Sequence, residues 1–416
     1  MSRRAVVTGI GVIAPSGTSR DEHWSTVTTG ANRLGRIRLF DPSRYQTTIA
    51  GEVSGFDGAD RVDGRLLVQT DRWTWMAFAA AEQAIAEAGL DLSTMDPYVV
   101  SVVMASSSGG NQFGQRELQR LWSQPSRTVG AYQSIAWFYA ATVGQLSIRH
   151  HAKGPSNVLV AESAGGLDSL RHAARIIDRG ARVVLAGGLE APLSPYALAC
   201  QLRSGRLSPS TDPQRAYRPF DAHADGYVPG EGGAVLLVEE LEHALARQAP
   251  VIYGEIAGWG ATHDGAHPAT GSGGSARQYA RSMRLALDRA GVQPGAVDLL
   301  IPDALGLPEF DRTEVEAIGA VFGGVDVPVT THKSLTGRMY QGGAALDAVT
   351  ALLAMRTRTV PVSSGVEDPA PGCDLNFVPE TRKSTVDLVL IGARGFGGYN
   401  SSVLLRRYDP HETGGG

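Results

Sequence analysis

A serine lies at a sharp bend between a β-branched run and a helical stretch, in the segment "VLVAESAGGLDSL" that begins at Val158. A helix that begins at such a bend directs backbone N–H groups and the positive end of its dipole toward the bend, where they stabilise developing negative charge. Enzymes often place a nucleophile in this position. Ser163 is therefore a candidate nucleophile for acyl transfer.

An activated serine needs a base, normally a histidine, within hydrogen-bond reach. None of the ten histidines lies in a convincing catalytic setting: His172 belongs to the helix after the bend, and His332, in "TTHKS", is the nearest challenger. The sequence "AESAG" also lacks the G-x-S-x-G spacing of α/β-hydrolases. We therefore expect Ser163 to bond to the amides at the helix N-terminus, a role that suits serine. A self-sufficient acyltransferase that uses Ser163 remains the alternative.

The elements around this bend follow a repeated order of β-branched runs and Ala- and Leu-rich stretches, which predicts an α/β fold with mostly buried strands. Residues 158–170 are echoed by "VPVTTHKSLTGRMYQGGAALDAV" at 327–349, because each has a β-rich run, a bend and a glycine pair that leads into a helix. Paired glycines let two backbones approach closely. The echo predicts two related halves, residues 1–250 and 251–416.

Composition excludes several functional classes. The 416 residues contain 38 Lys+Arg and 42 Asp+Glu, so the excess of positive charge that nucleic acid binding requires is missing. Only two cysteines occur, Cys200 and Cys373, which argues against a disulfide framework and a four-cysteine zinc site, and we expect neither a metal nor a cofactor. Apolar runs are too short for a transmembrane helix, so we expect a cytoplasmic protein without a membrane partner. Residues 411–416, "HETGGG", are expected to form a mobile tail.

Five segments together resemble the β-ketoacyl synthases of the thiolase-like fold. They are "RRAVVTGIGVIAPSG", "RPFDAHADGYVPGEGGAVLLVEE", "DRTEVEAI", "KSLTGRMYQGGA" and "GFGGYNSSVLL", and the resemblance spans residues 3–406. It implies a five-layered αβαβα architecture with two pseudo-symmetric halves.

Active members of that family carry a Cys–His–His triad, which this chain lacks. In those members the cysteine is the first residue of "CTSGLD". This chain has "SAGGLD" there, so Ser163 stands at the cysteine position. The first histidine of those members is the first residue of "HGTxTP". This chain has "DALGLP" there, so Asp303 stands at that histidine position. The second histidine of those members is the last residue of "KSxxGH". This chain has "KSLTGR" there, so Arg338 stands at that histidine position. All three catalytic positions are replaced.

The replacements remove the chemistry of condensation. A thiolate must hold the growing chain, and histidine donors must stabilise the enolate that forms when malonate loses carbon dioxide. Asp303 would repel that enolate, and a guanidinium such as that of Arg338 does not release a proton near neutral pH. We expect Asp303 and Arg338 to form an ion pair that fills the vacated site, with both side chains turned to solvent as the alternative.

Loss of the triad with retention of the fold motifs is typical of the chain-length factors, the inactive partners of the ketosynthases in bacterial type II aromatic polyketide synthases. The resemblance implies a heterodimer with a catalytic ketosynthase that extends a poly-β-ketone from malonyl units on an acyl carrier protein. Many chain-length factors have glutamine where Ser163 stands, so the role proposed for that glutamine is not transferred to this chain. A homodimeric binding protein of the same fold remains a second alternative.

Four residues are candidates for the gate of the substrate tunnel. The segment "NQFGQRELQRLW" predicts a helix on which Asn111, Gly114 and Leu118 share one face. The resemblance implies that these three residues and Tyr196 form the gate, and small or polar side chains there predict a relatively long product, a decaketide or longer. Asn111 as a helix cap and Leu118 as a core residue remain the alternatives.

Overall fold

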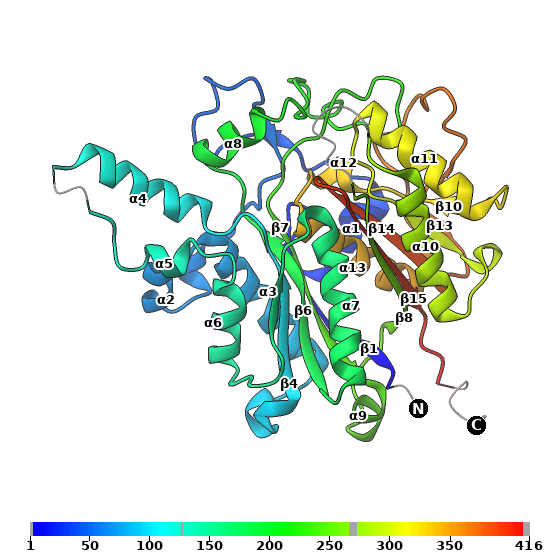
Figure 1. Ribbon diagram of the computed structural model, residues 1–416, viewed down its shortest axis with the longest axis horizontal. Helices are drawn as coiled ribbons and strands as arrows, with labels where there is room; N and C mark the ends of the chain where they lie inside the picture. Colours follow the sequence, from blue (N-terminus) through cyan, green and yellow to red (C-terminus); the bar gives the residue numbers. More distant parts are fainter. Residues whose placement is uncertain (1–2, 126–127, 266–272, 411–416) are drawn as a thin grey trace.

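The computed structural model describes residues 3–125, 128–265 and 273–410 (Figure 1). The expected C-terminal tail, residues 411–416, lies outside the described residues. Across the described ranges, no helix combines the length and the apolar character needed to cross a membrane.

Eleven strands form one mixed sheet in the order β12-β10-β9-β14-β15-β8-β1-β7-β6-β4-β5. Its first five strands by sequence lie together on one side: β1 (Ala5–Ile13), β4 (Val100–Ala105), β5 (Asn157–Leu159), β6 (Val183–Glu190) and β7 (Gly232–Glu240). The other six follow: β8 (Gly254–His263), β9 (Leu299–Ile301), β10 (Pro328–Val329), β12 (Asn376–Phe377), β14 (Leu388–Gly395) and β15 (Tyr399–Arg406). The two groups join only where β1 pairs with β8, at Val6–Glu255 and Val7–Gly254.

Helices cover both groups of strands on both sides. Helices α7 (Gly165–Asp178) and α13 (Gln341–Thr357) pack against strands of both groups, α3 (Arg72–Ala88) packs against the first group, and α10 (Ala276–Ala290) packs against the second and against α11 (Pro308–Phe322). Helix α13 is buried from Gln341 to Met355, as expected for a helix without a polar face. The predicted αβαβα arrangement is confirmed.

The glycine pairs serve the close approach that the sequence echo predicts. A Cβ on Gly166 would lie 2.2 Å from the carbonyl oxygen of Gln341, and one on Gly342 would lie 2.0 Å from the carbonyl oxygen of Gly232. No larger residue fits at either position, because both distances are far below a van der Waals contact. The start of α7 therefore lies directly against the start of α13.

Helix α4 (Asn111–Ser123) projects away from the body of the molecule, near α5 (Gln133–Ala136) (Figure 1). Asp71 anchors its base, because the carboxylate that accepts a hydrogen bond from the first amide of α3 also accepts one from Phe113 N, at 2.6 Å. The remaining helices are α1 (Arg20–Thr29), α2 (Gly64–Gln69), α6 (Ala141–Arg149), α8 (Pro195–Leu202), α9 (Leu241–Ala246) and α12 (Lys333–Thr336). Short strand pairs form from β2 (Gly35–Arg36) with β3 (Ile49–Ala50) and from β11 (Thr359–Val360) with β13 (Arg382–Lys383).

Candidate functional site

Three loops bring together the residues that the resemblance places at the triad positions. Ser163 lies in the turn between β5 and α7, Asp303 follows β9, and Arg338 lies between α12 and α13. Ser163 and Asp303 are each 1% exposed, as is Arg338. The fold therefore gathers the three residues in its interior.

Each of these loops contains a non-glycine residue with a positive φ. The values are 49° at Glu162, 53° at Ala304 and 50° at Tyr340. Such conformations cost free energy and cluster at functional sites, where the surrounding structure holds them. The three loops thus hold strained backbone positions at the point where they meet.

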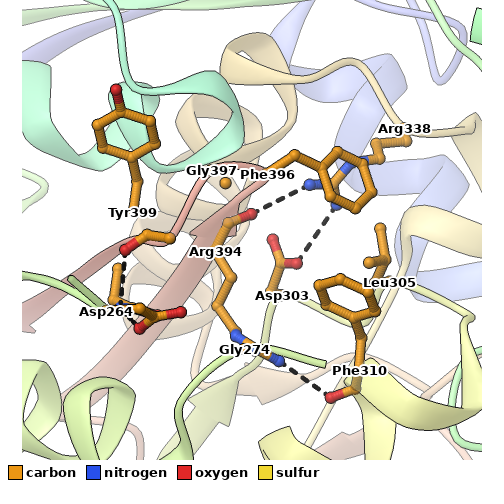
Figure 2. Close-up of a pocket in the computed structure, with 13 residues that line it drawn as sticks. Asp264, Gly274, Asp303, Leu305, Phe310, Arg338, Arg394, Phe396, Gly397 and Tyr399 are labelled. Atoms are coloured by element: carbon orange, nitrogen blue, oxygen red, sulfur yellow. Dashed lines mark hydrogen bonds and ion pairs between the residues drawn. The ribbon is translucent and has the colours of Figure 1, made fainter. Parts of the chain in front are cut away.

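Arg338 is the centre of the vacated site. Its Nη1 lies 3.3 Å from Asp303 Oδ2, and its Nη2 lies 3.1 Å from Glu162 Oε2 and donates a 3.0 Å hydrogen bond to the carbonyl of Arg394. Figure 2 shows the guanidinium beside the ring of Phe396, with its bonds to Asp303 and to the Arg394 carbonyl. The predicted Asp303–Arg338 ion pair is confirmed, and the alternative in which both side chains face solvent is wrong.

Glu162 is the member of this cluster that sequence reasoning missed. Besides Arg338, its Oε2 accepts a hydrogen bond from Phe396 N at 3.1 Å. Burial raises the pKa of Glu162, and the charge of Arg338 opposes that shift. Burial alone would lower the pKa of Arg338, but Glu162 and Asp303 hold it well above its ordinary value, so the guanidinium stays charged. The signal in the sequence was a carboxylate inside the otherwise small and apolar bend "VAESAGG".

Little space is left around Arg338. The cavity bounded by Asp303, Phe396 and Arg338 has a volume of about 10 Å³, which is close to the room that one water molecule needs. The guanidinium carbon lies 5.5 Å from the centre of the Phe396 ring and 5.7 Å from that of Tyr227. The space around Arg338 is therefore filled by the protein's own side chains.

Ser163 does not bond to the amides of α7 as expected. Its hydroxyl donates to the carbonyl of Tyr340 at 3.2 Å, and α7 has no side-chain cap. That expectation was wrong because the bend turns the hydroxyl toward the start of α13, which lies directly against it.

No histidine in the described part of the chain hydrogen bonds to Ser163. His332 Nε2 instead lies 3.2 Å from both Thr350 Oγ1 and Asp347 Oδ1, and His172 Nε2 lies 2.9 Å from Asn157 Oδ1. The geometry therefore gives the Ser163 hydroxyl no base, and it does not support the acyltransferase alternative.

The "DRTE" motif holds the loop that carries Asp303. Glu314 accepts hydrogen bonds from the backbone N–H groups of Asp303, at 2.8 Å, and Ala304, at 3.0 Å. Asp311 accepts from Gly306 N at 3.0 Å, and burial raises its pKa to about 8. The motif thus has a structural role that does not depend on catalysis, which sequence reasoning did not assign.

A buried lysine, Lys333, also holds the loop that carries Asp303. Lys333 Nζ donates to the carboxylate of Asp347 and, at 3.1 Å, to the carbonyl of Pro302, immediately before Asp303. Burial raises the pKa of Asp347 to about 6, and the charge of Lys333 opposes that shift. The "KS" motif and α13 are therefore tied to the loop of Asp303 through one ammonium group.

Two of the four gate candidates line a second and larger cavity. Asn111 and Tyr196 border a space of about 290 Å³, together with Ser107, Ser108, Glu162, Pro192, Ala197, Cys200, Gln201 and Tyr340. The N-cap of α4 is Gly110 without a side-chain bond, so Asn111 does not cap the helix. Leu118 does not border this cavity and is 40% exposed, so it is not a core residue.

Gly114 is covered by an indole. A Cβ on Gly114 would lie 2.7 Å from Trp137 Cδ1. The space that a glycine on this helix face was expected to leave open is therefore filled by Trp137, and the sequence argument for a long product loses the support of Gly114. Asn111 and Tyr196 do border the larger cavity.

Large apolar side chains are exposed along α4, the segment that joins it to α5, α5 itself and the residues after it. Those between 37% and 75% exposed are Leu118, Trp122, Val129, Tyr132, Ile135, Trp137, Phe138 and Tyr139. Strand β5 lies at the edge of the sheet, next to β4. Exposed apolar groups gathered in this way mark a protein interface.

Among the described residues, no group of three or more His, Cys, Asp or Glu side chains could hold a metal ion.

Two family models match the chain. The N-terminal domain of β-ketoacyl synthases matches residues 2–244, and the C-terminal domain of β-ketoacyl synthases matches residues 253–367. The chain is 49% identical over 405 residues to the tetracenomycin polyketide synthase ketoacyl synthase beta subunit of Streptomyces glaucescens, and the match covers 97% of this chain and 98% of that protein.

Solved structures of similar shape agree with these matches. The ishigamide ketosynthase/chain length factor superimposes with a TM-score of 0.91 at 28% identity, and the match covers 98% of this chain and 100% of the matched chain. A type II polyketide synthase acyl carrier protein in complex with its ketosynthase bound to the hexaketide gives a TM-score of 0.88 at 26% identity, with the match covering 98% of this chain and 100% of the matched chain.

Proposed function

The chain belongs to the β-ketoacyl synthase family, and we propose that within it the chain is a chain-length factor, the non-condensing beta subunit of a type II polyketide synthase. It pairs with a catalytic ketosynthase and shapes the tunnel into which the poly-β-ketone grows from malonyl units on an acyl carrier protein. The 49% identity to a ketoacyl synthase beta subunit supports this assignment across nearly the full length of both chains.

The observation that carries the proposal is the buried cluster of Arg338 with Asp303 and Glu162. It lies at the positions to which the family resemblance assigns the malonyl-binding histidines of active members, and it leaves about 10 Å³ of space. A guanidinium fixed by two carboxylates neither accepts nor donates a proton near neutral pH. The subunit therefore contributes by shape, and condensation takes place in its partner.

The exposed apolar side chains on α4 and α5 support the heterodimer. Trp122, on α4, is 75% exposed, and Trp137, which lies against Gly114 of the same helix, is 53% exposed. Covering this surface with a partner subunit would remove apolar area from water and would close the cavity of Asn111 and Tyr196 from outside. We propose that Asn111 and Tyr196 belong to the gate of that cavity, and that Gly114 acts on it only through Trp137.

We also propose that the two halves divide near residue 250, since β7 ends at Glu240 and β8 begins at Gly254. The cytoplasm is the proposed location. It suits a chain whose two cysteines, Cys200 and Cys373, are both unpaired.

Reconstitution with the cognate ketosynthase and acyl carrier protein tests the function. The complex should produce a polyketide, and after incubation with malonyl-loaded carrier protein, intact-protein mass spectrometry should find acyl groups on the carrier protein and the ketosynthase subunit and none on this chain. A covalent acyl group on this chain, or condensation by this chain without its partner, would overturn the proposal.

A further inference from the structure

Tyr340 lies on the wall between the two cavities. It borders the larger cavity of about 290 Å³. On its other side its ring meets Tyr227 edge-on, at 6.5 Å between ring centres, and Tyr227 in turn packs against Phe396 and Arg338 of the filled site. A chain that entered the larger cavity would therefore contact Tyr340 and Glu162, the two lining residues through which this cavity adjoins the filled site.

Several bonds fix the side chain and backbone of Tyr340. Its hydroxyl donates to Gln201 Oε1 at 2.7 Å and lies 3.3 Å from the hydroxyl of Tyr227. Gln201 is itself held, because its Nε2 donates to the carbonyl of Pro192 at 2.9 Å. The carbonyl of Tyr340 accepts the hydroxyl of Ser163 at 3.2 Å.

The backbone of Tyr340 has φ 50° and ψ −123°, a conformation that glycine adopts freely and a tyrosine rarely does. A residue with a large ring at such a position is unexpected, because glycine would satisfy the backbone without strain. The presence of a ring despite this strain indicates that the side chain has a function at this position. The bonds through Gln201 and Ser163 show how the fold holds it in place.

We propose that Tyr340 is a length-determining residue that closes the inner end of the substrate cavity. The inference rests on the proposed function, and it adds a wall to the gate already described at Asn111 and Tyr196. The apolar face of the ring stops the leading end of a growing poly-β-ketone. The hydroxyl contributes by locking the ring to Gln201, and Glu162, which also lines the cavity, pairs with Arg338 behind it.

The strained backbone offers a sharp test. Tyr340→Gly removes the ring at a position where glycine relieves the backbone, so the variant should fold and assemble. The reconstituted heterodimer should then release products that are longer than the wild-type product by one or more two-carbon units. Tyr340→Phe keeps the ring, so a complex with this variant should release products of the wild-type length.

A matched control separates the ring from the effect of glycine itself. Arg358 has φ 48° and ψ 53° at the C-terminal end of α13, away from the cavity. Arg358→Gly should therefore leave the product length unchanged. If both glycine variants lengthen the product, general loosening of the fold is responsible and the role of Tyr340 is refuted.

Failure of this inference is distinguishable from failure of the proposed function. An assembled Tyr340→Gly complex that releases only the wild-type length would overturn the role of Tyr340, while a shorter product from Asn111→Phe would still support chain-length control. Should Tyr340→Gly fail to assemble, Tyr340→Leu replaces it, because leucine keeps the position apolar with a shorter side chain. Wild-type length from an assembled Tyr340→Leu complex would equally overturn the inference, and a longer product would support it.

Discussion

The guanidinium of Arg338 and the carboxylate of Asp303 form an ion pair inside the protein, with Nη1 3.3 Å from Oδ2 and each side chain 1% exposed. Glu162 is the second carboxylate on the same guanidinium, at 3.1 Å. The interior beside the start of α13 is thus occupied by the protein's own charged groups. Stability here depends on a cluster that has no catalytic use.

Removing the guanidinium should destabilise the protein strongly. Arg338→Met leaves Asp303 and Glu162 buried without their partner, which we expect to lower the free energy of unfolding by about 3–5 kcal/mol. Urea unfolding of the heterodimer at a fixed concentration measures this. Arg407, which pairs with Asp387 at the surface and is 26% exposed, provides the control.

Arg407→Met should cost at most about 1 kcal/mol, because water screens surface pairs. Adding Glu162→Gln and Asp303→Asn to Arg338→Met should recover part of the loss, since both stranded charges are then removed. Equal costs for Arg338→Met and Arg407→Met would contradict a buried ion-pair cluster.

Ser163→Ala should leave polyketide formation by the assembled complex within about twofold of wild type. The hydroxyl has no base and donates only to the carbonyl of Tyr340. Single-turnover and steady-state rates of the reconstituted complex measure this. A loss on the order of a hundredfold, the size expected for a group that takes part in the chemistry, would show that Ser163 reacts.

His23 should make stability fall as the pH falls below about 6.5. The ring is fully buried between Ser16 and Thr350, and burial lowers its pKa from 6.5 to about 3. Between these two values the unfolded chain binds a proton at His23 that the folded protein does not, so the stabilising effect is complete above pH 6.5 and is lost as the pH falls toward 3. One proton corresponds to about 1.4 kcal/mol per pH unit.

The free energy of unfolding at pH 7.5, 6.0 and 5.0, compared between wild type and His23→Gln, measures that contribution. The variant should show a shallower decrease with acid. His332, whose pKa is also lowered well below its ordinary value by burial, should preserve part of the slope. Identical slopes in the two proteins would mean that His23 gains a proton in the folded state.

The ion pair could be predicted from the sequence because the resemblance placed Asp303 and Arg338 at positions that face each other, and opposite charges there leave few other arrangements. The layered fold was equally accessible, since its glycine pairs and buried strands are local patterns. Glu162 was missed because its direction depends on a positive φ at the bend, which residue types alone do not reveal.

The lining of the larger cavity was only partly predictable for a different reason. Helical spacing correctly put Asn111 and Gly114 on one face of α4. Whether the space beside a glycine is empty depends on a side chain distant in sequence, and here Trp137 fills it. The direction of the Ser163 hydroxyl likewise depends on Tyr340, which the chain brings near only through the packing of α13 against α7.

The most direct test of the central claim is the product length of the reconstituted complex with Asn111→Phe. Asn111 borders the cavity of about 290 Å³, so a ring at this position should shorten the polyketide while assembly and the partner's chemistry are preserved. Gln119→Phe, at an exposed position of the same helix, is the control and should give the wild-type length. Mass spectrometry of the released products should find a shorter chain from Asn111→Phe alone. An assembled and active Asn111→Phe complex that releases only the wild-type length would contradict the account.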